Sequence, residues 1–208
     1  DPSKNLIELA RQKGSPAAGT CKWIFGKAAY REWLTSKTGL LWLSGKSGMG
    51  KTMVAIQVAD QIEQHVLDKP RFKSVILHSF GGRTATLILW SLILQLITLE
   101  PSLLKHLLPE SAVRLVALES SLRVYSFDLV WRIFSNMIFD NPFQDVYCIL
   151  DGLEMCTEQS LADLLNKLPQ VLTDSTRLKI LVASRENIPS ITRALSSYPN
   201  IRMNPYYE

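Results

Sequence analysis

The stretch LLWLSGKSGMGKTMVAIQVAD, residues 40–60, joins an apolar run to a helical pattern through a glycine-rich loop. Residues 40–44 are typical of a buried strand. The residues from 51 to about 66 predict a helix, because a branched apolar side chain recurs every four positions, at Val54, Val58, Ile62 and Val66. Three glycines lie in the eight residues 45–52. Since each glycine costs about 0.5–1 kcal/mol relative to alanine in a regular helix, we expect this loop to serve a ligand.

The loop fits the pattern G-x-x-x-x-G-K-S/T, and it lies between a strand and a helix, as this pattern requires. Small residues allow successive backbone N–H groups to surround phosphate oxygens at the N-terminus of a helix, whose dipole favours an anion. Lys51 is then expected to reach the β- and γ-phosphates, and the Thr52 hydroxyl to bind Mg²⁺. The predicted phosphate-binding residues are Gly45, Lys46, Ser47, Gly48, Met49, Gly50, Lys51 and Thr52.

A magnesium ion that bridges two phosphates usually also needs a carboxylate from a neighbouring strand. The stretch VYCILDGLE, residues 146–154, supplies one, because Asp151 follows a buried strand at the edge where open α/β sheets bind ligands. We therefore expect Asp151 and Thr52 to form the metal site. Glu154, three residues further on, is a candidate for polarising the attacking water. The alternative for Glu154 is a solvated surface carboxylate.

Arg185 ends another apolar strand pattern, LKILVASRE at residues 178–186, and is the second candidate catalytic residue. At the carboxyl edge of the sheet its guanidinium is expected to touch the γ-phosphate, with a surface pair to Glu186 as the alternative. Arg83, in the stretch SFGGRT, is a further candidate that an ordinary loop position would also explain. His78, in the strand pattern before it, is expected to be a packed core residue.

Strand and helix patterns alternate along the chain. Further strands are predicted at residues 72–80, 145–151, 178–184 and 200–204. Helical stretches are predicted at residues 86–118 with breaks at Pro101 and Pro109, at 127–138, at 161–172 with Thr157 as N-cap, and from Pro189. Such alternation indicates an α/β fold in which a mainly parallel sheet is covered by helices on both faces. This three-layer sandwich is the architecture of P-loop NTPases.

The composition of the chain argues against nucleic-acid binding and membrane insertion. The 23 basic and 19 acidic residues give a net charge of +4 and are dispersed along the 208 residues, which favours a solvated surface over a nucleic-acid interface. The most apolar segment, residues 86–99, is shorter than the ~20 residues of a bilayer span, so no membrane contact is expected. The three cysteines lack zinc-site spacing and suit a reducing, cytoplasmic compartment.

The ordered set of motifs resembles the NACHT domain, the STAND-class P-loop NTPase module of NLR-type receptors, above all in fungal receptors of the heterokaryon-incompatibility type. GTCKWIFGKAAYREWL, residues 19–34, resembles the lead-in of that family. After the phosphate loop, DLVWRIFSNMI, VYCILDGLEMC, LKILVASRE and IPSITRALSSYPNIRM follow in the family's order. The resemblance covers nearly the whole chain, and we divide it into a helical lead-in, residues 1–38, and the NTPase domain, residues 39–208.

The resemblance implies that Asp151 is the Walker B carboxylate and Arg185 the sensor arginine. The family pattern after the strand is Asp-small-hydrophobic-Asp-Glu, whereas this chain has Glu154 and Met155 in the last two positions. The second acid, which the family is expected to use for activating water, is therefore a methionine. We expect nucleotide binding with slow hydrolysis or none.

These observations predict a Mg²⁺-dependent switch that binds ATP or GTP within an NLR-like signalling protein of innate immunity. The expected partners are the other domains of that receptor and further copies of it. A P-loop kinase for a small molecule or nucleotide is an alternative, although the sequence shows no arginine-rich lid of the kind such kinases close over their substrates. A scaffold that nucleotide stabilises without being hydrolysed is the third interpretation.

Overall fold

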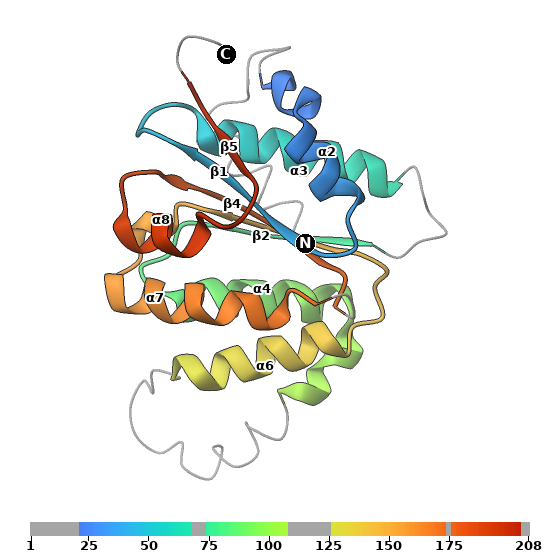
Figure 1. Cartoon of the computed structure of the whole chain (residues 1–208). Helices are drawn as coiled ribbons and strands as arrows, with labels where there is room; N and C mark the ends of the chain where they lie inside the picture. The colour runs from blue at the N-terminus through green and yellow to red at the C-terminus, as the bar shows by residue number, and fades with distance from the viewer. Residues whose placement is uncertain (1–20, 68–73, 108–125, 174–175, 205–208) are drawn as a thin grey trace.

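The computed structural model describes residues 21–67, 74–107, 126–173 and 176–204, and its centre is a parallel sheet (Figure 1). The five strands lie in the order β2-β3-β4-β1-β5. Their bounds are β1 (Gly39–Gly45), β2 (Val75–Phe80), β3 (Val146–Asp151), β4 (Leu178–Arg185) and β5 (Asn200–Arg202). A strand is therefore present at each predicted place, although residues 72–73 of the predicted second strand lie outside the described residues and the last strand ends at Arg202. β4 lies between β1 and β3.

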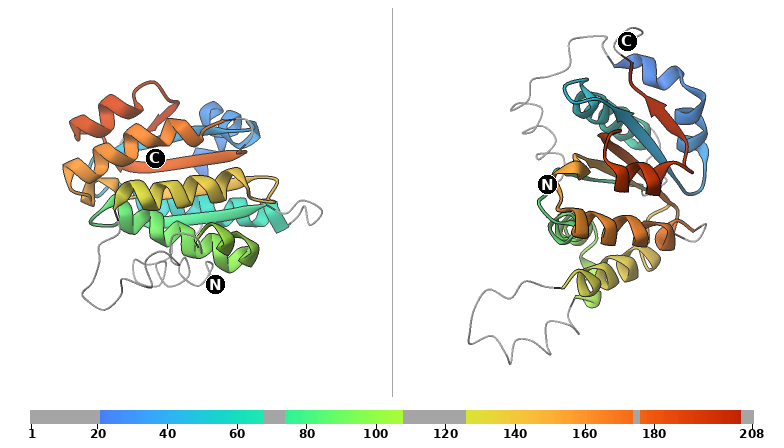
Figure 2. Two further views of the ribbon diagram at one scale, coloured as in Figure 1. Left: turned by 90° about the horizontal axis from the view of Figure 1, so that it is seen from below. Right: turned by 60° about the vertical axis from the view of Figure 1, so that its left-hand side comes forward.

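Helices cover both faces of the sheet, which confirms the predicted three-layer α/β fold (Figure 2). One layer holds η1 (Lys22–Gly26), α2 (Ala28–Thr35) and α3 (Lys51–Leu67). The other holds α4 (Ala85–Leu99), α7 (Glu158–Lys167) and α8 (Pro189–Leu195), and α6 (Phe127–Phe139) packs on α4 on the side away from the sheet. Three short 3-10 helices complete the described elements: η2 (Pro101–His106), η3 (Leu153–Met155) and η4 (Leu168–Val171).

The strands are apolar throughout because each faces two cores. In β1, Leu40 and Trp42 pack into the core under α4, α6, α7 and α8, whereas Leu41 and Leu43 pack into the core under α2 and α3. This division follows from the two-residue period of a strand, which directs successive side chains to opposite faces. His78 is buried in β2, as expected, and its backbone pairs with the side chain of Gln95 in α4.

The predicted break at Pro101 is confirmed, and a second helical prediction needs correction. The stretch at 86–118 divides into α4 and η2, which begins at Pro101, and its remainder with Pro109 lies outside the described residues. The predicted helix at 161–172 leaves the α conformation after Lys167 and continues as η4. Pro169 has no N–H to continue an α-helix, which explains that end. Thr157 does precede α7, but its side chain makes no capping hydrogen bond.

The helical lead-in is part of the packed molecule where the structure describes it. In residues 21–38, η1 and α2 bury Ile24, Tyr30 and Trp33 against the core that contains Leu41 and Leu43. The division between residues 38 and 39 stays a prediction.

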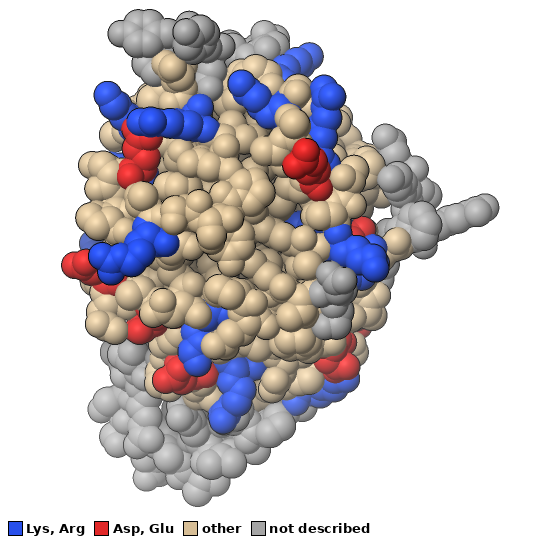
Figure 3. Space-filling model, in the orientation of Figure 1, with Lys and Arg blue, Asp and Glu red and all other residues tan. Residues whose placement is uncertain are grey.

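Among the described residues no helix combines the length and the apolar character needed to cross a membrane. On the face of the molecule in Figure 3, acidic and basic side chains are interspersed.

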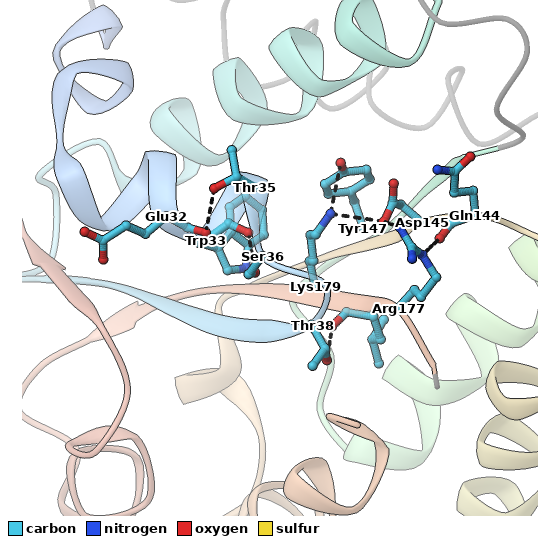
Figure 4. Close-up of polar contacts among 11 residues, drawn as sticks. Glu32, Trp33, Thr35, Ser36, Thr38, Gln144, Asp145, Tyr147, Arg177 and Lys179 are labelled. Atoms are coloured by element: carbon cyan, nitrogen blue, oxygen red, sulfur yellow. Dashed lines mark hydrogen bonds and ion pairs between the residues drawn. The ribbon is translucent and has the colours of Figure 1, made fainter. Parts of the chain in front are cut away.

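A polar cluster lies at the amino ends of β3 and β4, away from the phosphate loop (Figure 4). The Lys179 ammonium is buried, with its Nζ 3.1 Å from Asp145 Oδ1 and 4.7 Å from the centre of the Tyr147 ring. Arg177 pairs with the same carboxylate at 3.2 Å. Burial raises the pKa of the Tyr147 phenol to about 12, so it remains neutral beside the lysine. Asp145 is thus the carboxylate that balances a buried cation.

Replacing Asp145 with alanine is expected to lower the free energy of unfolding by about 3–5 kcal/mol, because it leaves the buried Lys179 ammonium without its carboxylate. Chemical denaturation of the wild type and the variant measures this change. Lys167→Ala is the control, since Lys167 pairs with an exposed Asp128 at 3.6 Å and should cost less than about 1 kcal/mol. Equal losses in the two variants would show that the Asp145 cluster contributes no more than a surface ion pair.

Candidate functional site

The glycine-rich loop lies between β1 and α3, as the sequence predicts, and it ends at the N-terminus of α3. Gly48 and Gly50 both have a φ of 78°, in the left-handed region that other residues rarely adopt. A Cβ at either position would meet no atom within 4 Å, so the strain of a substitution would come from the backbone alone. These glycines turn the loop around the start of α3, where backbone N–H groups and the helix dipole favour an anion.

Lys51, the first residue of α3, directs its side chain back along the loop. Its Nζ donates to the backbone carbonyls of Gly45 at 3.0 Å and Lys46 at 2.7 Å, and the residue is only 8% exposed. Burial lowers the pKa of the Lys51 ammonium below its ordinary value, while the nearby carboxylates of Glu154 and Asp151 act in the opposite direction. Lys51 thus places a cation at the anion-favouring start of α3, and a metal ion beside Asp151 would offset the negative charge of the two carboxylates.

The side chains of Thr52 and Asp151 are in contact at the carboxyl edge of the sheet. Thr52 lies in the first turn of α3 and Asp151 at the carboxyl end of β3, and the Thr52 hydroxyl donates to Asp151 Oδ2 at 2.5 Å. Hydroxyl and carboxylate oxygens are ligands that Mg²⁺ prefers. The donor set therefore fits the metal site expected from the sequence, with both oxygens beside the phosphate loop.

Glu154 and Arg185 form an ion pair on the same side of the sheet. Arg185 Nε lies 3.3 Å from Glu154 Oε1, and the Glu154 side chain is 12% exposed. Glu154 Oε2 is also buried and has no hydrogen-bond partner among the described residues. Glu154 is thus not a solvated surface carboxylate. The alternative pair of Arg185 with Glu186 is not formed either, because Glu186 pairs with Arg202 at 2.6 Å.

A cavity of about 260 Å³ brings these residues together. Its lining includes all the predicted site residues except Gly45 and Lys46, whose carbonyls hold Lys51 instead. The lining residues that the sequence predicts are Ser47, Gly48, Met49, Gly50, Lys51, Thr52, Asp151, Glu154 and Arg185. The structure thus places the expected phosphate, metal and catalytic candidates around one space, and their roles remain proposals.

Sequence reasoning missed part of the cavity wall. Phe80 and Gly81, at the end of β2, and Gly152 also line it. The double glycine at residues 81 and 82, next to Arg83, is the sequence signal for this part of the wall. Arg83 is not among the lining residues, and its backbone carbonyl accepts a hydrogen bond from the Thr157 N–H at 3.2 Å.

Hydrogen bonds join the loop after β2 to the loop after β3. The Gly81 N–H donates to the Asp151 carbonyl at 2.7 Å, and the Cys156 thiol donates to the Gly82 carbonyl at 3.2 Å. Burial raises the pKa of the Cys156 thiol to about 11, so it keeps the proton it donates at neutral pH. Met155 lies in this wall and is 65% exposed, with its Sδ 3.0 Å from the position of a Cβ on Gly81.

The strand order, the loop between β1 and α3 and the acidic end of β3 define a domain of the nucleotide-binding P-loop NTPase class. Within that class, the chain belongs to the family described as Nephrocystin 3, N-terminal, whose model matches residues 19–185. The family match and the relatives below confirm the NACHT-like P-loop NTPase domain that the motifs predict.

One curated relative is the Vegetative incompatibility protein HET-E-1 of Podospora anserina, 25% identical over 205 residues. The alignment covers 95% of this chain but only 14% of that relative. Among solved structures, the ORC2 protein of Aeropyrum pernix, in ADPNP–ADP complexes, aligns with a TM-score of 0.52 and 13% identity over 91% of this chain and 48% of that one. Cdc6p of Pyrobaculum aerophilum aligns with a TM-score of 0.49 and 14% identity over 98% and 45% of the two chains.

Proposed function

We propose that this domain binds ATP or GTP together with Mg²⁺ and acts as the nucleotide-dependent switch of a longer, NLR-like signalling protein. The proposal rests on one observation: the side chains of Lys51, Thr52 and Asp151 lie together at the carboxyl edge of the sheet. The buried Lys51 ammonium lies in the phosphate loop, and the Thr52 hydroxyl lies 2.5 Å from the Asp151 carboxylate. A cation, a glycine-rich anion site and a pair of hard oxygen ligands suit a magnesium nucleotide.

Each group has a separate task. The backbone of residues 45–51 and the Lys51 ammonium bind phosphates, while Thr52 and Asp151 would hold Mg²⁺. The metal ion would neutralise phosphate charge and orient the phosphates. Glu154 is the carboxylate available to polarise water, and Arg185 the cation available to the γ-phosphate. We infer slow hydrolysis, because the position after Glu154 carries a thioether where a second acid would assist.

The proposed role as a switch is inferred from the relative HET-E-1 rather than from the geometry of the cavity. The relative's name, vegetative incompatibility protein, suggests a signalling response, and the matched region is only 14% of that relative's length. A nucleotide shifts the balance between two states of a protein only by its different affinity for each. We propose that the two states differ in contacts between this domain, the rest of its polypeptide and further copies of it, in the cytoplasm.

ATP and GTP are expected to bind the 208-residue chain with dissociation constants within about tenfold of each other, or ~1.4 kcal/mol. The reason is that the cavity is lined by the phosphate loop, the strand ends and the η3 residues Glu154 and Met155, which would face phosphates and metal rather than the base. Calorimetric titration of both nucleotides with Mg²⁺, and of each with EDTA, measures the affinities and the contribution of the metal.

Light scattering on the same samples is expected to show monomers. Absence of binding by either nucleotide would refute the proposed function, and equal affinity with EDTA would refute the metal site. A preference for one base well above tenfold would instead reveal a formed base pocket.

A further inference from the structure

The edge strand β5 is bonded to the residue from which the phosphate loop departs. Among the described strands β5 pairs with β1 alone, and Figure 1 shows the two side by side. The Trp42 N–H donates to the Pro199 carbonyl at 2.9 Å, and the Met203 N–H donates to the Ser44 carbonyl at 2.8 Å. Ser44 directly precedes Gly45, the first residue of the loop. The end of β5 therefore lies against the start of the phosphate loop.

A buried side-chain hydrogen bond joins the same two strands. Ser44 is fully buried, and its Oγ donates to Oδ1 of Asn200, an exposed residue of β5, at 2.9 Å. The other side chains on this face of β1, Leu40 and Trp42, pack into the core. A buried hydroxyl costs free energy unless it is paired, and an apolar pair of similar shape would be about as stable. This bond therefore contributes more to geometry than to stability.

The backbones of β5 and the loop also approach closely at Gly45. A Cβ on Gly45 would lie 3.1 Å from Met203 Cβ, an atom that no side-chain rotation can move away. Met203 is itself buried. The Gly45 carbonyl accepts the hydrogen bond from Lys51 Nζ at 3.0 Å. The position of β5 thus limits the position of Gly45, and Gly45 in turn holds the cation of the loop.

We propose that Asn200 is a positioning residue for the phosphate loop, and that the pairing of β5 with β1 and the binding of nucleotide stabilise each other. Asn200 does not line the cavity, so it acts through Ser44 rather than by touching the ligand. Coupling between two binding events is reciprocal, so bound nucleotide must also hold β5 on β1. The inference rests on the proposed function and adds the element that keeps the loop in its binding geometry.

A double-mutant cycle tests the positioning role, with Asn200→Ala, Ser44→Ala and the double variant titrated by calorimetry with Mg²⁺ and a non-hydrolysable β,γ-imido ATP. Each single change is expected to weaken binding about three- to tenfold, the range of one lost hydrogen bond. The double variant should bind no more weakly than either single variant, because both changes remove the same bond. Asn200→Asp keeps the acceptor oxygen and should retain the wild-type affinity.

Hydrogen exchange of single amides tests the reciprocal effect. Saturating Mg-nucleotide is expected to slow exchange of the Met203 amide, which bonds to Ser44, more than exchange of the Val75 amide. The Val75 amide bonds to the Asp145 carbonyl at the amino end of the other edge strand, β2, so it reports the general stabilisation by ligand. In Asn200→Ala the additional protection of Met203 should be smaller.

Thr38→Val is the matched control for the cycle. The Thr38 hydroxyl donates to the Leu178 carbonyl at 2.8 Å, so this change also removes a hydrogen bond between neighbouring strands, but at the amino end of β1. Thermal unfolding should show a similar loss, and nucleotide affinity should be unchanged. Wild-type affinity in Asn200→Ala and Ser44→Ala, additive losses, or an equal loss in Thr38→Val would overturn the inference while leaving nucleotide binding established. A wild type that binds no nucleotide would instead refute the proposed function itself.

Discussion

Replacing Lys51 with alanine is expected to abolish Mg-nucleotide binding while the domain remains folded. The Lys51 ammonium is the cation of the phosphate loop, and its Nζ lies within 3.0 Å of two loop carbonyls at the start of α3. Losing its charge-assisted contacts to phosphate should cost at least about 1.5–3 kcal/mol of binding free energy. Because burial already lowers the pKa of this ammonium, its removal also relieves an unfavourable desolvation, so little stability should be lost.

Calorimetric titration of the variant with Mg-ATP and Mg-GTP tests this result, and thermal unfolding checks the fold. Lys105→Ala serves as a control of equal charge, since Lys105 is 59% exposed in η2 and pairs with Asp140 outside the cavity. It should bind as the wild type does. Unchanged affinity in Lys51→Ala would contradict both the role of the loop and the proposed function.

Replacing Met155 with glutamate is expected to raise the rate of nucleotide hydrolysis, by a factor in the range of ~10²–10⁴ that general-base assistance typically contributes. Met155 lines the cavity and is 65% exposed, so a carboxylate there would remain hydrated and ionised. Binding should change little, because the phosphate loop, Thr52 and Asp151 stay in place. Single-turnover hydrolysis with the wild type and the variant, at saturating nucleotide, measures the effect.

Met155→Gln is the matched control, because it has the size and polarity of glutamate without its basicity. It should hydrolyse nucleotide at the wild-type rate. A wild type that already turns over several times per second would show that Glu154 suffices, and the argument for a missing acid would then be wrong. An equal rise in the glutamine variant would point to removal of the thioether rather than to a new base.

The parts of the site that could be predicted are those set by local sequence. The order of strand, loop and helix around residues 45–52 fixes the phosphate loop, and a carboxylate at a strand end must lie at the same sheet edge. In the structure, Lys51, Thr52 and Asp151 line one cavity. The layers of the fold could also be predicted from the sequence, because apolar residues recur with a different period in strands and in amphipathic helices.

The site residues that could not be predicted from the sequence are those whose position depends on which strands are neighbours in the sheet. Gly81 enters the wall because β2 pairs with β3, which places Phe80 opposite Asp151. The partner of Arg185 is another example, because the adjacent Glu186 was the local alternative and Glu154 lies thirty-one positions away. Strand order and the direction of loop side chains follow from packing across the whole domain rather than from any short pattern.

The position of β1 in the sheet has a consequence for how the chain reaches its native state. β1 pairs with β4 and β5, so residues 39–45 find their neighbours among residues 178–185 and 200–202. Such distant pairings make folding slow, because long loops must close before the contacts form. During synthesis the ribosome produces the glycine-rich loop before β4 and β5, so the strand that carries it gains both flanking strands only when the last described one emerges. Newly made chains therefore pass through an interval in which β1 has unpaired backbone edges, the kind of species that chaperones protect from aggregation.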